Sequence, residues 1–87
     1  MQYTIYSTEV ADSAFTKEQS EAFAKVYAEA LKAEFKETGY DIAVEVRHNV
    51  SGYSNELKGC ENPILADGIN ALAEVVWERE MENFFAV

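Results

Sequence analysis

The sequence predicts one small α+β domain, a two-layer α/β arrangement with two helices packed on one face of a two- or three-stranded sheet. Two observations predict this class. Apolar residues alternate with polar ones over residues 3–7 and 40–47, and they recur at helical spacing over 17–37 and 63–83. The chain of 87 residues has room for one core only, so residues 1–87 are expected to form a single compact domain in the order β-α-β-(β)-α.

The first strand is expected over Tyr3–Ser7, a short run of aromatic and β-branched residues. Over residues 8–15 the apolar residues show no regular spacing, and this segment is expected to form a loop. The first helix follows over 17–37. Thr16 and Gln19 have the spacing of a capping box at its start, and Gly39 is a typical stop. Its apolar stripe comprises Phe23, Val26, Tyr27, Ala30, Leu31 and Phe35.

The second strand is expected over 40–47, where apolar residues begin to recur at every second position. Because a long helix joins it to the first strand, the two strands are expected to be parallel. The turn-forming run Asn49–Gly52 then allows a weak third strand, Tyr53–Leu57, to return antiparallel. The last helix is expected to run from Pro63, with Asn62 as its N-cap, to about Asn83. Its inner face comprises Leu65, Ile69, Leu72, Ala73, Val76, Trp77 and Met81.

The composition excludes several classes of protein. Hydrophobic residues make up 48% of the chain, which is too many for a disordered protein, and one cysteine cannot build a disulfide scaffold. Sixteen acidic residues against seven basic ones give a net charge of −9. Direct binding of nucleic acid is therefore not expected, and a partner with a basic surface is expected instead. We find neither a signal peptide nor a membrane-length apolar run, and therefore expect a cytoplasmic protein.

No pattern in the sequence predicts catalysis, a metal site or a cofactor. His48 and Cys60 are the one histidine and the one cysteine, so a Cys-His nucleophile pair is conceivable. The simpler interpretation is a histidine at a strand end and an incidental thiol, because no glycine-flanked nucleophile motif accompanies them. The four glycines form no phosphate-binding loop, and a zinc or calcium motif is absent. We therefore expect no catalytic residues, no metal and no cofactor.

The acidic residues of the last helix are the main candidate for a functional surface. Like charges spaced at i, i+4 destabilise a helix, as do carboxylates near its C-terminus, so this charge acts against the stability of the helix. Such a cost is typical of a binding surface, although a solvated face that only aids solubility is the alternative. The outward positions are Asp67, Glu74, Glu78 and Glu82, with Glu80 close by and Arg79 as the sole cation.

The chain also has more aromatic residues than a core of this size usually needs. Five tyrosines, five phenylalanines and one tryptophan are present, and surplus aromatic side chains beside acids are typical of protein interfaces. Each of them taken singly is more often a core residue. The expected surplus is Tyr6 on the outer side of the first strand, Tyr53 near the turn, and Phe84 and Phe85 at the C-terminus.

In size, charge and architecture the chain resembles the small acidic anti-defence proteins of phages, namely anti-CRISPR proteins and DNA-mimicking anti-restriction proteins. The row Glu74, Glu78 and Glu82, with Asp67 and Glu80, carries the resemblance, which rests on no sequence motif. The resemblance implies a viral inhibitor in the host bacterial cytoplasm that occupies a basic surface of a CRISPR-Cas or other nucleic-acid-binding effector, as a monomer or weak homodimer. The mixed charge of the first helix leaves specific surface blocking and phosphate mimicry equally open. An oligomeric structural module, an antitoxin-like partner of a basic toxin and a Cys60-dependent enzyme are the other classes.

Overall fold

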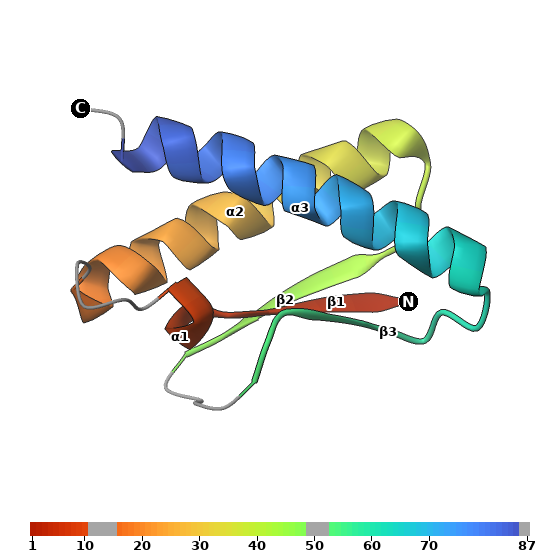
Figure 1. The fold of residues 1–87 in the computed structure, drawn as a ribbon, viewed down its shortest axis with the longest axis horizontal. Helices are drawn as coiled ribbons and strands as arrows, with labels where there is room; N and C mark the ends of the chain where they lie inside the picture. Colours follow the sequence, from red (N-terminus) through yellow and green to blue (C-terminus); the bar gives the residue numbers. More distant parts are fainter. Residues whose placement is uncertain (11–15, 49–52, 86–87) are drawn as a thin grey trace.

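A computed structural model of the chain describes residues 1–10, 16–48 and 53–85. Two long helices lie over one face of a three-stranded mixed sheet (Figure 1), so the α+β class and the order β-α-β-β-α are confirmed. Within the described residues, no helix combines the length and apolar character that crossing a bilayer requires. The elements are β1 Gln2–Tyr6, α1 Ser7–Val10, α2 Lys17–Thr38, β2 Ala43–Arg47, β3 Glu56–Lys58 and α3 Pro63–Phe85.

The short helix α1 was not expected. The sequence predicts Ser7 as a strand residue and residues 8–15 as a loop, but Ser7–Val10 form a helix of four residues that packs against α2. Ser7 is buried in this arrangement. A helix of four residues is too short to show helical spacing of apolar residues. Its formation is therefore determined by contact with α2 and not by a pattern in the sequence.

Both long helices begin where their caps predict. The Thr16 hydroxyl accepts a hydrogen bond from the Gln19 amide at 3.1 Å, and the Gln19 side chain accepts one from the Thr16 amide at 2.9 Å. Asn62 Oδ1 accepts hydrogen bonds from the amides of Ile64 and Leu65, at 3.0 and 3.2 Å. These contacts satisfy amides that have no partner inside the helix, and they confirm the predicted capping box and N-cap.

Helix α2 ends at Gly39, whose φ of 82° is the left-handed conformation of a helix stop. The Tyr40 amide then donates to the Phe35 carbonyl at 2.9 Å, and the two rings pack edge to face. Tyr40 is therefore part of the helix end. This explains why β2 begins at Ala43, three residues later than the alternation predicts.

The strand order is β2-β1-β3. Strands β1 and β2 are parallel, as predicted, and Ile5 lies opposite Val46. Strand β3 is antiparallel, but its neighbour is β1, with Tyr3 opposite Leu57, and it does not form a hairpin with β2. Tyr53–Asn55 were predicted to lie in this strand and do not, because the Asn55 side chain accepts the Tyr6 amide at 2.8 Å where a strand carbonyl would. The predicted turn Asn49–Gly52 lies outside the described residues.

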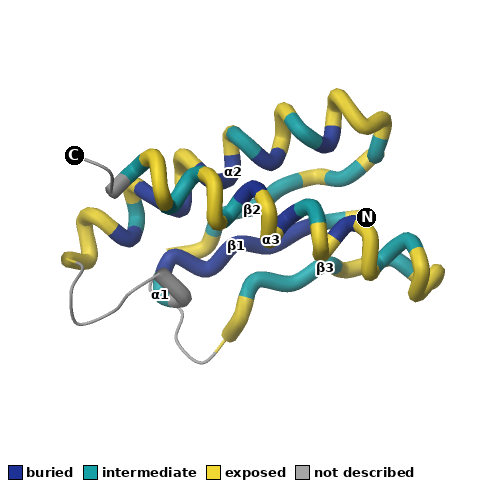
Figure 2. The backbone as a smooth tube through the Cα atoms, turned by 45° about the horizontal axis from the view of Figure 1, so that its top comes forward, coloured by how far each residue is buried: buried dark blue, intermediate teal, exposed yellow. Residues whose placement is uncertain are grey.

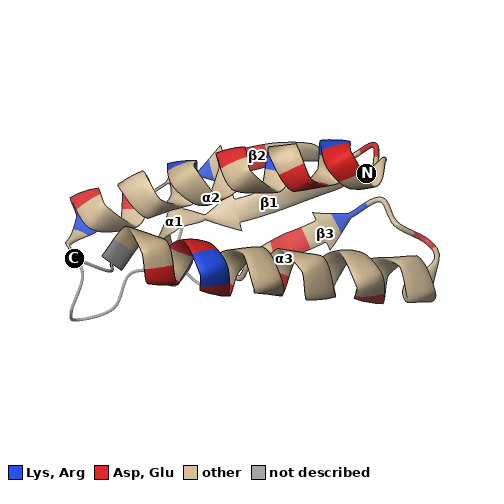
Figure 3. Ribbon diagram, turned by 90° about the horizontal axis from the view of Figure 1, so that it is seen from above, with Lys and Arg blue, Asp and Glu red and all other residues tan. Residues whose placement is uncertain are grey.

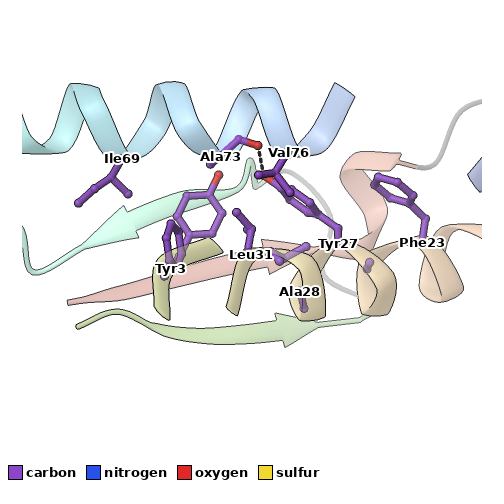
Figure 4. Packing of buried hydrophobic residues seen from close by; sticks show 11 residues of the cluster. Tyr3, Phe23, Tyr27, Ala28, Leu31, Ile69, Ala73 and Val76 are labelled. Carbon is purple, nitrogen blue, oxygen red and sulfur yellow. Dashed lines mark hydrogen bonds between the residues drawn. The ribbon is translucent and has the colours of Figure 1, made fainter. Parts of the chain in front are cut away.

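The core lies between the sheet and the two helices. Strand β1 is buried from Tyr3 to Tyr6, and buried positions recur on the facing sides of α2 and α3 (Figure 2). The Tyr27 hydroxyl donates to the Ala73 carbonyl at 2.7 Å and so joins the two helices (Figure 4). Val26 was expected in the core and is 39% exposed. The buried cluster comprises Tyr3, Ile5, Phe23, Ala24, Tyr27, Ala28, Leu31, Phe35, Ile69, Ala73 and Val76.

Candidate functional site

Four carboxylates lie along the outward face of α3. Ile69, Ala73 and Val76 are at most 1% exposed and mark the side of the helix that faces the core. At 100° per residue the four acidic positions fall on the opposite side, and all four residues are exposed. None of them forms an ion pair with another described residue. We call this set the α3 acidic row, and it comprises Asp67, Glu74, Glu78 and Glu82.

Glu80, predicted to lie close to these acids, is on the other side of the helix. Its side chain is 19% exposed and accepts a hydrogen bond from Arg79 Nε at 3.3 Å. Two residues along a helix are about 200° apart, so Glu80 cannot share a face with Glu78 and Glu82. Glu80 is therefore not part of the α3 acidic row.

Arg79, the only cation of α3, is directed towards α2. Its Nη1 atom lies 3.1 Å from Glu34 Oε1, and its Nε atom binds Glu80. The hydrogen bond to Glu34 is the main reason that the pKa of Arg79 is raised above its ordinary value. Desolvation, the second-largest effect, lowers this pKa, and the contacts with Glu80 raise it. The guanidinium is thus occupied by carboxylates outside the row.

Elsewhere in the described chain, three basic side chains pair with acids of their own element. Lys32 contacts Glu29 on α2, Arg47 contacts Glu45 on β2, and Lys58 contacts Glu56 on β3, each at 3.2 to 3.3 Å. Seen from above, α2 carries both signs of charge, whereas α3 carries acids and a single basic residue (Figure 3). The outward face of α3 is therefore a region of uncompensated negative charge.

A cleft of about 270 Å³ opens beside the α3 acidic row. No expectation from the sequence includes this cleft. Asn70, Glu74 and Trp77 are spaced i, i+4, i+7 on α3, which places them on one stripe of the helix and was the available signal. Nothing in the sequence indicates that Tyr3 of β1 or Asn55, just before β3, would face that stripe. The cleft is lined by Tyr3, Tyr27, Asn55, Asn70, Glu74 and Trp77.

The remaining aromatic candidates do not join this face. Tyr6 and Tyr53 stack with ring centroids 5.4 Å apart. Tyr6 alternates with Tyr3 and Ile5, so it points to the sheet face away from the helices, and it is only 5% exposed. Tyr53 is 58% exposed. Tyr6 is thus a covered residue rather than a free contact, and the pair lies on the side of the sheet that α3 does not cover.

Of the two C-terminal aromatic side chains, the structure describes that of Phe84. Phe84 is half-buried, and its ring meets that of Phe23 edge to face at 5.7 Å. It therefore belongs with the core-facing side of α3. Phe85 is the last residue of α3, and its side chain lies outside the described residues.

His48 and Cys60 follow opposite ends of the sheet, because Arg47 lies opposite Tyr6 and Lys58 lies opposite Gln2. His48 is exposed just after β2, and the Cys60 thiol donates to the Asn62 carbonyl at 3.4 Å. In the described part of the chain, no three His, Cys, Asp or Glu side chains gather as a metal ion would require.

Comparison with protein families, with curated proteins and with solved structures finds no match to this chain.

Proposed function

We propose that the protein is a non-enzymatic inhibitor that binds a basic, nucleic-acid-handling effector protein and blocks it, in the manner of a phage anti-CRISPR or other anti-defence protein in the cytoplasm of a bacterial host. The binding surface is the α3 acidic row with the cleft beside it. The partner is a protein surface, and the inhibitor acts without metal or cofactor.

The observation that carries this proposal is the exposed, unpaired charge of the α3 acidic row. Four carboxylates share one face of α3, and Arg79 is engaged with Glu34 and Glu80. Glu29 on α2 has its partner Lys32 on the same helix. A row of carboxylates that pairs with no described residue is suited to compensation by a basic partner.

The spacing of the row suits such a partner. Glu74, Glu78 and Glu82 follow one another at intervals of about 6 Å along the helix axis, because each residue adds about 1.5 Å. This interval is of the same order as that between neighbouring phosphates of a nucleic-acid strand. The row therefore fits a groove lined with Lys and Arg, either as a mimic of the phosphates or as a specific block of the surface around them.

The test has two steps. The tagged protein is used to capture partners from a bacterial lysate, and the captured proteins are identified by mass spectrometry. Each captured nucleic-acid-handling protein is then purified, and its nucleic-acid binding or cleavage is measured against added inhibitor. Stoichiometric inhibition by the wild-type protein is the expected result.

Variants identify the surface that acts. The triple variant Glu74→Gln, Glu78→Gln, Glu82→Gln should lose inhibition. The matched control Glu18→Gln, Glu21→Gln, Glu29→Gln removes the same charge from α2 and should keep it. Equal loss in both variants, or a captured effector whose activity the wild-type protein leaves unchanged, would refute the proposal.

An oligomeric module is the second candidate, and two exposed apolar side chains favour it. Ile64 and Val75 of α3 are 83% and 59% exposed, whereas Trp77 packs on Phe23 with ring centroids 4.9 Å apart and is not free for such an interface. Sedimentation at micromolar concentration separates the candidates. A stable oligomer that dissociates when Ile64 and Val75 are replaced by Ser would favour this alternative.

The enzyme alternative rests on His48 and Cys60. Because these residues follow opposite ends of the sheet, we expect the folded double variant His48→Ala, Cys60→Ser to keep full inhibitory activity. Complete loss of activity in that variant, with an unchanged melting temperature, would restore catalysis as the leading explanation.

A further inference from the structure

The cleft beside α3 has the size and lining of a pocket for one side chain. Its volume of about 270 Å³ is slightly below the range of about 300–1,000 Å³ that is usual for sites of drug-sized ligands. Three of its six lining residues are aromatic, and they come from three different elements: Tyr3 from β1, Tyr27 from α2 and Trp77 from α3. The cleft therefore lies where the sheet and both long helices meet.

The aromatic part of the lining is held in place before any ligand arrives. The Tyr27 hydroxyl is fixed on the Ala73 carbonyl, and Tyr27 is 1% exposed. The Tyr27 and Trp77 rings meet at 88° with centroids 5.1 Å apart, so together they form a rigid corner. Trp77 is the partly exposed side of this corner, and a ligand that contacts it does not have to order it, which lowers the cost of binding.

The polar part of the lining selects for positive charge. Glu74 is the only charged residue among the six, and its carboxylate forms no ion pair with another described residue. Asn70 adds an amide group that can accept a hydrogen bond, whereas Asn55 Oδ1 already accepts the Tyr6 amide. Glu74 also belongs to the α3 acidic row, so the cleft continues the surface that we assign to the partner.

We propose that this cleft binds an arginine side chain of the basic partner, with the guanidinium against the Trp77 ring and hydrogen-bonded to Glu74. The assignment deepens the proposed function and rests on it. A guanidinium suits the lining better than an ammonium group does, because it is planar, lies against aromatic rings, binds a carboxylate through two N–H groups and has further donors for the Asn70 amide oxygen.

The test uses the free protein and a small probe. Trp77 is the only tryptophan of the chain, so its indole N–H signal in an NMR spectrum reports on the cleft. N-acetyl-argininamide is titrated into the protein, and N-acetyl-citrullinamide, which has nearly the same shape without the charge, is the control ligand. We expect a saturable shift of the Trp77 signal with the arginine compound and a weaker response, or none, with the citrulline compound.

Two variants locate the charge that is recognised. Glu74→Gln should weaken binding of N-acetyl-argininamide about tenfold, because it removes the charge-assisted pair. Glu82→Gln removes one charge from the same row outside the cleft and should leave the affinity almost unchanged. Equal responses to the two ligands, equal effects of the two variants, or the absence of a saturable Trp77 shift in the wild-type protein would each overturn the assignment.

These outcomes are independent of the inhibition assay. If an effector is inhibited through the α3 acidic row while Trp77 does not respond to the arginine compound, the arginine pocket is refuted and the proposed function stands. If Trp77 responds but no effector is inhibited, the pocket stands and the function assigned to it is refuted.

Discussion

At the scale of single residues, Gly39 and Gly68 meet opposite backbone requirements. Gly39 has a φ of 82°, which costs a residue with a Cβ about 1–2 kcal/mol, and no neighbouring atom would meet that Cβ within 4 Å. Gly68 lies inside α3 with open space around it. In a helix interior, glycine is about 0.5–1 kcal/mol less favourable than alanine. The sign of the effect is therefore decided by backbone strain at Gly39 and by helix propensity at Gly68.

We predict that the same substitution has opposite effects at these two positions. Gly39→Ala should lower the free energy of unfolding by about 1–2 kcal/mol, and Gly68→Ala should raise it by about 0.5–1 kcal/mol. Urea denaturation with unchanged m-values measures both. Changes of the same sign would show that the assigned end of α2 or the assigned interior of α3 is incorrect.

Tyr27 joins α2 to α3 through a hydrogen bond that is buried. Tyr27→Phe removes the donor to the Ala73 carbonyl and little else, so we predict a loss of about 0.5–1.5 kcal/mol in the free energy of unfolding. Tyr53→Phe is the matched control. Tyr53 is 58% exposed, and its substitution should change the stability by less than about 0.5 kcal/mol. A control as destabilising as Tyr27→Phe would mean that the bond to Ala73 contributes nothing specific.

At the scale of elements, α3 carries charge that its own stability does not favour. Glu74–Glu78 and Glu78–Glu82 are like-charge pairs at i, i+4, and each costs about 0.2–0.5 kcal/mol. Glu82 also lies in the last turn, where the helix dipole favours cations and no basic residue is present. The carboxylates lie on the solvent side, so their removal leaves the core contacts of α3 intact.

The variant Glu74→Gln, Glu78→Gln, Glu82→Gln should therefore melt at the same temperature as the wild-type protein or a few degrees higher, which corresponds to about 0–1.5 kcal/mol. The matched α2 variant, Glu18→Gln, Glu21→Gln, Glu29→Gln, should be neutral or less stable, because it loses the Glu29–Lys32 contact and an acid in the first turn of α2. A clear drop in the melting temperature of the α3 variant would assign these acids a structural role.

The long helices could be predicted from the sequence because their information is local. A capping box, an N-cap and a stop glycine each act within a few residues, and all three are found where the sequence places them. Strand β3 depends on its partner instead. A side chain, Asn55, takes the Tyr6 amide, and β3 pairs with β1 rather than with β2. No local pattern reports which edge of a sheet a weak strand will join.

The same distinction applies to the candidate site. The outward position of Glu74, Glu78 and Glu82 follows from helical spacing and could be predicted. Glu80 was grouped with them because it is near in sequence, although two residues along a helix place it on the opposite side. The cleft could not be predicted, because Tyr3 reaches it from a strand more than seventy residues from Trp77 in the chain. Tertiary packing alone creates it.

At the scale of the whole molecule, the charge is divided between two kinds of surface. Lys32, Arg47 and Lys58 each lie within 3.3 Å of a carboxylate on their own helix or strand, so α2 and the sheet carry locally balanced charge. The outward face of α3 has no such balance, and the chain as a whole carries −9. A domain with this distribution is oriented by a basic surface before it makes contact, with α3 leading.

We therefore predict that association with the captured effector is fast and strongly dependent on salt. Raising NaCl from about 0.1 M to about 1 M shortens the screening length from about 10 Å to about 3 Å, so the association rate constant measured by stopped flow should fall by about tenfold or more. The dissociation rate should change less, because contacts made at short range are screened less.

The variants provide the control for this salt dependence. The α3 triple Gln variant should start from a lower association rate and show a shallower dependence on salt, and the α2 variant should follow the wild-type protein. Circular dichroism at each salt concentration verifies that the fold is intact. An association rate that is the same at both concentrations would show that apolar docking, through residues such as Ile64 and Val75, and not the charge of α3, brings the partner to this surface.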